Sequence, residues 1–357
     1  MWKKPHGSTA RATVIRPPKH YDHRVHLMDQ SKRIIGRLYP ELQDLSDAGT
    51  LIAVPRPETY VERRTDGYVE PEVVFLVGTA HTSKESAKEV ERVIQAIRPE
   101  NVVVELCRSR SSVMYDEDVI TRMSRGGKGW FDLAGGENMV DTFQKTLRLG
   151  GGSALFLRLL LSRVSSMMAE RMDVETVGEE FVVARKTAVD VDAQLVLGDR
   201  PIEITLRRAW ESLSFMQKIR FIRMMGAGLG SNESELVVNR ETLERLRKDD
   251  DAVNALLYNL TDSFPELAQS LIYERDLYLA WSLKRSKAVN GTKRVVGVIG
   301  KGHTRGVCYA LTHDAGTLRF RDLAGSRNEN ALSNGLARFA LETSIFAAMY
   351  AWWSYVQ

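Results

Sequence analysis

The 357-residue chain has little cysteine and no long run of charge of one sign. Cys107 and Cys308 are its only cysteines, and they form no CxxC pair. This disfavours a disulfide scaffold and a zinc site built only from cysteine, and it favours a reducing compartment. The 50 basic and 46 acidic residues are mixed along the chain and leave a net charge of +4. Such mixing is typical of a solvated surface, so we expect no nucleic-acid partner.

The first 30 residues also lack the apolar segment of a signal peptide. Residues 1–25 contain six lysines and arginines, one acid and three prolines, which is typical of a flexible basic arm. His20, His23 and His26 are spaced by three, so a helix could align them as metal ligands. A solvated arm that is rich in histidine is the simpler interpretation. We predict a basic, partly flexible N-terminal extension over residues 1–70.

Continuous apolar runs predict strands that are buried on both faces of a sheet. Residues 73–77 form such a run, and the mainly apolar segments 102–106, 193–197 and 294–299 predict three further strands. Between the first two, residues 83–97 have apolar side chains at helical spacing, and Pro99 ends that helix. This β-α-β order argues for a parallel pair of strands joined by a right-handed crossover. We predict an α/β domain over residues 71–315, with a mostly parallel sheet and helical insertions.

The tail combines a polar stretch with a long apolar one. Residues 316–338 are predicted to form a polar linker. Residues 339–356 contain Glu342 as their only charged residue. As a helix they would be about 27 Å long, which is enough for the hydrocarbon core of a bilayer. We predict a C-terminal hydrophobic helix that anchors the chain in a membrane, with an amphipathic helix docked on the domain or on a partner as the alternative.

Two histidines occupy the same local frame, each directly after an apolar run. Gly78-Thr79-Ala80-His81 follows the first run, and Gly300-Lys301-Gly302-His303 follows the fourth. In parallel sheets, ligand sites form outside the carboxyl ends of the strands. Glu105 lies at the end of the second run, where a buried carboxylate needs a metal, an arginine or a proton as its partner. We therefore predict that His81, Glu105 and His303 share one polar site.

Two histidines and one carboxylate can hold a divalent cation and leave a position open for water, whose pKa the metal would lower. The predicted ligands are His81, Glu105 and His303, and the candidate ions are Mn²⁺, Co²⁺ and Zn²⁺. The alternative is that the histidines only end strands and that Glu105 forms a salt bridge with an arginine. Gly198-Asp199-Arg200-Pro201 and Tyr273-Glu274-Arg275-Asp276 are two further segments whose charged residues are candidates for the same site.

Six segments of the chain together resemble a known family: GTAH (78–81), VVVELCRSR (102–110), GEEF (178–181), LGDRPIEITLRRAW (197–210), YERD (273–276) and GKGH (300–303). With them, the chain resembles the TraB/PrgY family, which is related to the Tiki proteases. The resemblance covers about residues 73–312 and implies a TraB/Tiki/EreA-like fold. It places six residues on the family's characteristic positions: His81, Glu105, Arg200, Glu274, Arg275 and His303.

The first function that the resemblance implies is a metal-dependent hydrolase, because Tiki-type relatives are metal-dependent proteases. TraB/PrgY members themselves are linked to the inactivation of peptide pheromones, so the expected substrate is a peptide. His81, Glu105 and His303 would hold the metal, and Glu274 would be a fourth ligand or the general base. Arg200 or Arg275 would stabilise the developing oxyanion.

The second function is a non-catalytic adaptor or regulator, anchored in a membrane by its C-terminal helix. Eukaryotic TraB-domain proteins of this layout resemble outer-mitochondrial-membrane proteins that face the cytosol, with the cytoplasm and the chloroplast as alternative locations. Residues 130–133 and 264–267 each place an aromatic residue three positions before leucine, beside an acid. Such motifs bind autophagy receptors when they are exposed. Residues 180–184 resemble a membrane-contact motif, although they also lie within the family-like stretch.

Overall fold

The computed structural model describes residue 14 and residues 16–57, 67–79, 84–115, 178–221, 263–316 and 318–324. Helices and strands alternate around one sheet of five strands, which confirms the predicted α/β class. The hydrophobic helix predicted over residues 339–356 lies outside the described residues. Among the residues that are described, no helix has the length and apolarity needed to cross a bilayer.

The five strands are β1 (Leu51–Pro55), β2 (Val73–Thr79), β3 (Asn101–Val104), β4 (Gln194–Leu197) and β5 (Arg294–Gly300). Their order in the sheet is β1-β2-β5-β3-β4. β1 runs antiparallel to β2, and the other neighbours are parallel. The four predicted strands and the mostly parallel sheet are therefore confirmed.

The first two runs are parallel, as predicted, but they do not pair directly, because β5 lies between β2 and β3. Thr79 at the end of β2 pairs with Gly300 at the end of β5, and Val104 in β3 pairs with Val298. Runs that are apolar on both faces can pair with any similar neighbour, so the sequence does not state this order. The consequence is functional: the end of β5 lies beside the ends of both β2 and β3.

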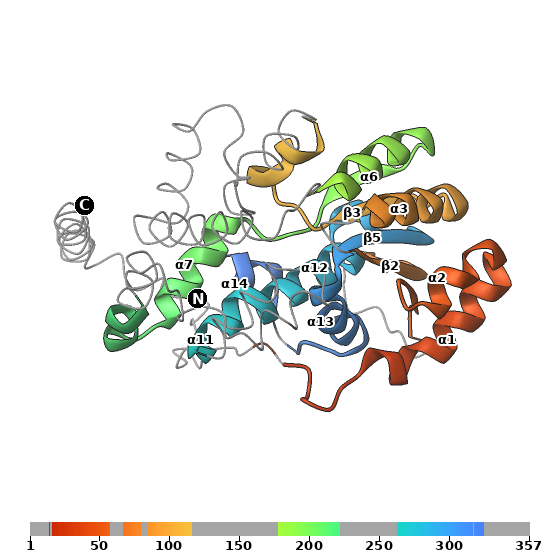
Figure 1. Cartoon of the computed structure of the whole chain (residues 1–357). Helices are drawn as coiled ribbons and strands as arrows, with labels where there is room; N and C mark the ends of the chain where they lie inside the picture. Colours follow the sequence, from red (N-terminus) through yellow and green to blue (C-terminus); the bar gives the residue numbers. More distant parts are fainter. Residues whose placement is uncertain are drawn as a thin grey trace, which may run out of the picture.

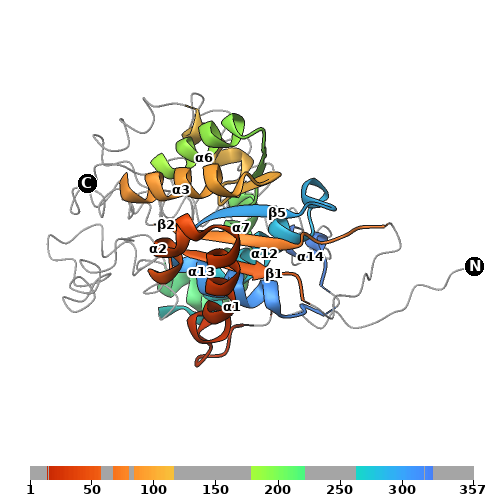
Figure 2. The same ribbon diagram turned by 90° about the vertical axis from the view of Figure 1, so that its right-hand side faces the viewer.

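Helices cover both faces of the sheet in three layers. α3 (Lys84–Ile97) and α6 (Glu179–Asp190) lie on one face, and α12 (Glu274–Lys284) and α13 (Lys301–Thr312) lie on the other (Figures 1 and 2). Alternate residues of β2 divide between the two layers, since Phe75 and Val77 pack with α3 and α6, whereas Leu76 packs with α12 and α13. This alternation follows from the pleat of the strand.

The fold begins earlier than Pro71, where the sequence places the start of the domain. α1 (His23–Leu38) crosses the edge of the sheet at β1, and Ser31 Oγ accepts a hydrogen bond of 2.8 Å from the Ala53 N–H. A helix thereby satisfies part of an edge strand that would otherwise be open to pairing with other chains. The apolar run of β1 ends at Pro55, and the strand pairs with β2 over its whole length. Within the described chain, the N-terminal histidines form no group suited to a metal.

Four further α-helices and four short 3₁₀- or π-helical turns are also present among the described residues. They are η1 (Pro40–Leu42), α2 (Gln43–Asp47), η2 (Arg108–Met114), α7 (Ile202–Ser212), α11 (Pro265–Ala268), a π-helical turn (Gln269–Tyr273), η5 (Lys287–Val289) and α14 (Phe320–Ala324). α14 lies within the predicted polar linker.

Phe264 and Leu267 are each 1% exposed, so the predicted receptor motif at residues 264–267 is buried and is not available to a receptor. Residues 130–133 lie outside the described residues.

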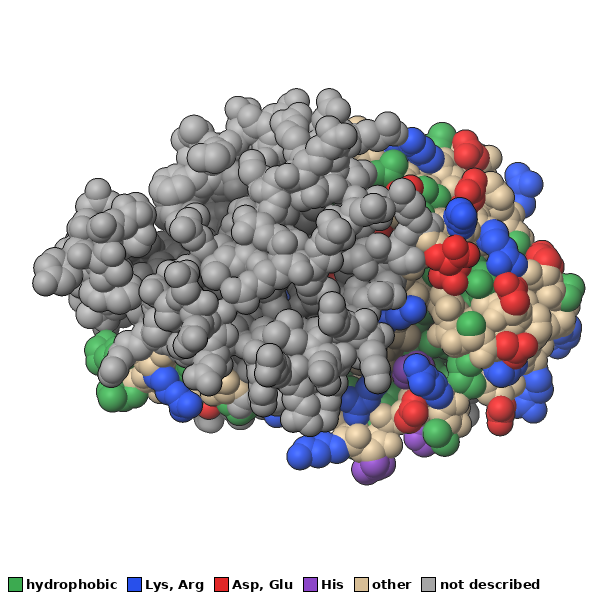
Figure 3. All heavy atoms as spheres, viewed as in Figure 1, with side chains coloured by type: hydrophobic (Ala, Val, Ile, Leu, Met, Phe, Trp, Pro, Cys, Tyr) green, Lys and Arg blue, Asp and Glu red, His purple; other side chains and the backbone are tan. Residues whose placement is uncertain are grey.

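Charged side chains of both signs are interspersed on the described part of the face shown in Figure 3.

Lys284, in contrast, is only 8% exposed. Its Nζ donates hydrogen bonds to the carbonyl oxygens of Leu311 (2.8 Å) and Ala310 (3.2 Å), in the last turn of α13. Burial lowers the pKa of Lys284 to about 8. The ammonium group therefore caps a helix end but carries a desolvation cost.

We expect this cost to appear as a pH dependence of stability. Below pH 8, Lys284 is charged in both the folded and the unfolded chain. Between pH 8 and pH 10.5, the unfolded chain keeps the proton that the folded chain releases, so the contribution of Lys284 to stability rises with pH, by at most about 3 kcal/mol. The measurement is urea denaturation of the wild type and Lys284→Met at pH 7.5 and pH 10. The stability difference between the two proteins should change across this range, and a constant difference would contradict the prediction.

Candidate functional site

Glu105 leaves the sheet directly after β3 and is 2% exposed. Its N–H donates to the Val298 carbonyl of β5 at 3.1 Å, which extends the pairing of the two strands by one residue. Its carboxylate turns toward the end of β5, where Oε2 accepts a hydrogen bond of 2.8 Å from the Gly300 N–H. One oxygen is thereby bound by backbone, and Oε1 faces the side chains described next.

Arg275 of α12 binds two buried carboxylates. Its Nη2 donates to Glu105 Oε1 at 2.9 Å and to Asp199 Oδ2 at 2.8 Å, and its Nε donates to Asp199 Oδ1 at 3.2 Å. Asp199 also accepts a hydrogen bond from Arg110 of η2. Burial alone would lower the pKa of Arg275, but Asp199 and Glu105 outweigh it and raise that pKa. Arg275 therefore stays charged and joins the ends of β3 and β4 to α12.

His303 lies in the first turn of α13 and is 3% exposed. Its Nδ1 lies 2.6 Å from Asp276 Oδ1, while its Nε2 lies 3.3 Å from Glu105 Oε1 and 3.2 Å from Arg275 Nη1. Burial opposes the charged imidazolium, but Glu105 and Asp276 outweigh burial and raise the pKa of His303. In both charge states the Nδ1–H can donate to Asp276. In the neutral ring, Nε2 is then free to accept from Arg275.

These contacts give the cluster an uneven charge. Glu105, Asp199 and Asp276 supply three carboxylates, whereas Arg110 and Arg275 supply two guanidinium groups. Among these five side chains, carboxylates outnumber guanidinium groups by one, and carboxylates favour a proton on a neighbouring histidine or a bound cation. We call this set of five residues together with His303 the Glu105 cluster.

A second buried network lies beside the Glu105 cluster and has the opposite charge balance. Glu274 accepts hydrogen bonds from Arg200 Nη1 at 2.6 Å and from Arg208 Nε at 2.7 Å and Nη2 at 3.1 Å. Arg200 also donates to Thr205 Oγ1 and to the carbonyl oxygens of Ser270 and Leu323. Complete burial lowers the pKa of Arg200 to about 10 against the opposing effect of Glu274. We call Glu274, Arg200 and Arg208 the Glu274 network.

The structure brings Glu105, Arg275 and His303 together, as the sequence predicts for the shared site. It places Arg200 and Glu274 in the neighbouring network, where both oxygens of Glu274 are bound by arginine. The alternative in which Glu105 forms a salt bridge with an arginine is also realised, with Arg275. His81 lies outside the described residues, and the last described residue before it is Thr79, beside Gly300.

Four members of the two networks have no individual role predicted from the sequence. They are Asp199, Asp276, Arg110 and Arg208. Asp199 and Asp276 each stand directly beside a predicted residue, in the segments GDRP and YERD. Adjacent residues on a helix point about 100° apart, so the sequence alone does not show that Asp276 and Arg275 both reach the same histidine.

Glu105 and His303 are placed as two ligands of a metal site would be. Two ligands of a tetrahedral ion with bonds of about 2.0–2.1 Å lie roughly 3.3 Å apart. Glu105 Oε1 and His303 Nε2 are separated by 3.3 Å. Arg275 contacts both atoms, so a divalent cation would compete with its guanidinium group. No group of three or more His, Cys, Asp or Glu side chains suited to a metal is present among the described residues, and the third predicted ligand, His81, is not among them.

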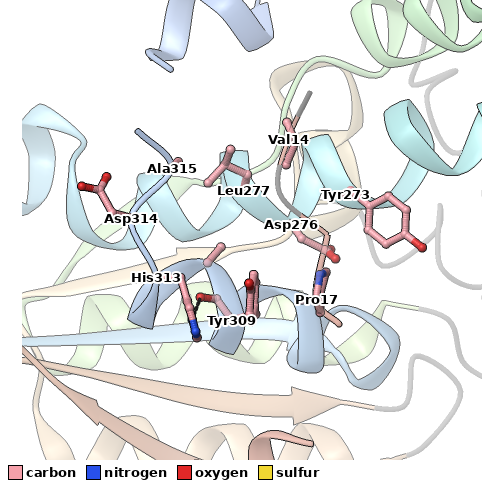
Figure 4. A pocket seen from close by; sticks show the side chains of 11 residues that line it. Val14, Pro17, Tyr273, Asp276, Leu277, Tyr309, His313, Asp314 and Ala315 are labelled. Carbon is pink, nitrogen blue, oxygen red and sulfur yellow. Dashed lines mark hydrogen bonds between the residues drawn. The ribbon is translucent and has the colours of Figure 1, made fainter. Parts of the chain in front are cut away.

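A small pocket lies on the outer side of the Asp276–His303 contact. The N-terminal segment crosses α12 and α13 there, and Figure 4 shows Val14 and Pro17 of this segment near Asp276. Val14 is 3% exposed and packs with an apolar cluster on α12 and α14. Arg305 of α13 holds the segment by donating to the carbonyl oxygens of Pro18, Lys19 and Tyr21. Asp276 is therefore covered by the chain's own N-terminal region.

The fold and the site together define an α/β domain with a buried cluster of acids, arginines and histidine at the carboxyl end of a mainly parallel sheet. A model of the TraB/PrgY/gumN family matches residues 66–314. The chain therefore belongs to the TraB/PrgY/gumN family.

The chain is similar to proteins from animals and from an archaeon. The TraB domain-containing proteins of Homo sapiens and Bos taurus are each 31% identical over 249 residues, which is 66% of this chain and 61% of the relative. An uncharacterized protein of Methanocaldococcus jannaschii is 28% identical over 235 residues, which is 66% of this chain and 52% of that protein. The match thus spans about six tenths of the animal relatives' length.

Proposed function

We propose that the chain is a metal-dependent hydrolase that acts on peptides, with Glu105, His303 and His81 as metal ligands. The observation that carries the proposal is the 3.3 Å separation of Glu105 Oε1 and His303 Nε2 at the ends of two neighbouring strands. The carboxylates of Glu105, Asp199 and Asp276 also support it, because carboxylate oxygens are common ligands of divalent cations. A divalent metal in such a site activates water and polarises a carbonyl group.

The roles of the other residues follow from their contacts. Arg275 already faces Glu105 Oε1 and His303 Nε2 with two guanidinium nitrogens, so it is the arginine that would stabilise negative charge on a substrate carbonyl oxygen. Glu274 forms salt bridges with both Arg200 and Arg208. We therefore propose that Arg200 and Glu274 stabilise the packing of α7 and α12 and take no part in the reaction.

The test of the proposal is elemental analysis of the full chain, purified without chelators, beside His303→Ala. We expect about one equivalent of Mn²⁺, Co²⁺ or Zn²⁺ in the wild type and little in the variant. His313→Ala is the matched control, because His313 lies at the other end of α13 and is exposed. A wild type that contains no metal, and whose melting temperature none of the three ions raises, would refute the metal site.

Hydrolysis needs a separate measurement. The wild type, loaded with the metal that it retains, should cleave members of a mixed peptide library followed by mass spectrometry, and Glu105→Gln should not. If the protein bound metal but showed no metal-dependent cleavage, the proposed metal site would stand and the proposed peptidase activity would be refuted.

The contact between Arg275 and Glu105 favours a second function, a non-catalytic domain in which the Glu105 cluster only supports the fold. In this case, the chain would act as an adaptor or regulator of peptide or protein partners at the mitochondrial outer membrane, anchored by residues 339–356. Fluorescence microscopy of the full chain and of a chain truncated after residue 338 tests the placement. We expect the full chain at mitochondria and the truncated chain in the cytosol. The same distribution for both would contradict the anchor.

A further inference from the structure

The contact between Asp276 and His303 determines which way the imidazole ring faces. Asp276 Oδ1 lies 2.6 Å from His303 Nδ1, and both side chains are nearly fully buried. An ionised carboxylate accepts hydrogen bonds but does not donate them, so beside ionised Asp276 the ring carries a proton on Nδ1. The opposite nitrogen, Nε2, is then directed at Glu105 and Arg275.

Gly306 makes this contact sterically feasible. It lies one turn after His303 on α13, opposite Asp276 of α12. A Cβ atom at position 306 would lie 1.8 Å from Asp276 Oδ2, 2.5 Å from its Cγ and 3.0 Å from its Cβ. Carbon and oxygen atoms that are not bonded to each other do not approach so closely. Any other residue at position 306 would therefore push the Asp276 carboxylate away from His303 or separate the two helices.

We propose that Asp276 and Gly306 are positioning residues for His303: Asp276 holds the ring with Nε2 toward Glu105, and Gly306 leaves the space that Asp276 needs. The benefit to metal binding rests on the proposed function, whereas the orientation of the ring does not. Residues that donate or accept at the second nitrogen of a metal-binding histidine fix its tautomer and its direction.

The first experiment replaces the carboxylate without changing its shape, in Asp276→Asn of the full chain. The position of the imidazole proton is measured through ¹⁵N chemical shifts of His303 in long-range ¹H–¹⁵N spectra at one fixed pH. We expect Nδ1 to be protonated in the wild type and the tautomer with the proton on Nε2 to gain population in the variant. Unchanged ¹⁵N shifts would overturn the role of Asp276, whether or not the protein binds metal.

Metal affinity gives the second readout. We expect the Kd of Asp276→Asn for Mn²⁺, Co²⁺ or Zn²⁺ to rise about 10–100-fold over that of the wild type. Asp314→Asn is the matched control, because Asp314 lines the same pocket and its Oδ1 accepts a hydrogen bond from the Gly316 N–H. If the wild type binds no metal, the proposed function fails and the ¹⁵N shifts alone decide the positioning role. If it binds metal and Asp276→Asn keeps the wild-type Kd, the positioning role is overturned.

Gly306→Ala tests whether Asp276 needs the space that the missing side chain of Gly306 leaves open. We expect this variant to lose both the wild-type ¹⁵N pattern of His303 and its stability. The double variant Asp276→Ala/Gly306→Ala removes the two atoms that would clash most closely, so its loss of melting temperature should be smaller than the sum of the two single losses. Its metal affinity should stay low, because the carboxylate is gone. Losses that simply add, or a Gly306→Ala protein with unchanged spectra, would overturn the assignment of Gly306.

Discussion

Replacing Arg275 with methionine is expected to lower the free energy of unfolding by about 3–5 kcal/mol. The reason is that Glu105 and Asp199 would remain buried in the folded chain without the guanidinium group that binds both of them. Methionine is close in length and apolar, so it fills space without supplying charge. The measurement is urea denaturation followed by circular dichroism, with the unfolding midpoint and slope compared with those of the wild type.

Arg285→Met provides the control for this prediction. Arg285 pairs with Glu70 at 2.9 Å, but its side chain is 31% exposed, so water can replace the lost partner. We expect a loss of about 1 kcal/mol or less there. If Arg275→Met were no less stable than Arg285→Met, the Glu105 cluster would not be the charged centre of the fold that its geometry indicates.

The same variant also separates the two proposed functions. A divalent cation and the Arg275 guanidinium compete for Glu105 Oε1 and His303 Nε2. In a metal-binding protein, millimolar Mn²⁺ should therefore restore part of the stability that Arg275→Met loses, because the ion supplies the missing positive charge. No recovery with Mn²⁺, Co²⁺ or Zn²⁺ would favour the non-catalytic function.

Replacing Glu274 with leucine is expected to have an effect of similar size, about 3–5 kcal/mol. Arg200 and Arg208 would then face each other in the interior without the carboxylate that separates them. The pKa of Arg200 is already lowered to about 10, which reflects how costly its charge is at this position. Thermal and urea unfolding of Glu274→Leu measure the loss.

Two further variants accompany Glu274→Leu: a stability control and a test for metal binding by Glu274. Asp44→Asn breaks an exposed pair with Arg92, in which the two side chains are 59% and 47% exposed, and should cost well under 1 kcal/mol. Glu274→Gln tests for a role in metal binding. Because Glu274 belongs to the neighbouring network, we expect the metal content of each folded molecule to stay at the wild-type value. A loss of metal in Glu274→Gln without a loss of stability would return Glu274 to the ligand set.

Much of the fold follows from local sequence patterns. The apolar runs that became β2, β3, β4 and β5 are long enough to indicate buried strands without any knowledge of their neighbours. The helical spacing of residues 83–97 likewise predicts α3, and five apolar residues there are buried, namely Ala87, Val90, Val93, Ile94 and Ile97. β1 was not predicted, although its apolar run at residues 51–54 is as long as β3 or β4.

The sequence by itself determined that Glu105 and His303 closely follow apolar strands and that charged residues lie near them, because such patterns are local. Only the tertiary structure decided which charges meet. Placing β5 between β2 and β3 brought Gly300 beside both Thr79 and Glu105. The packing of α12 on α13, which Gly306 permits, set Arg275 against Glu105 and Asp276 against His303, and left Glu274 to Arg200 and Arg208. Such pairings depend on side-chain directions across 170 residues of chain, and no short-range pattern records them.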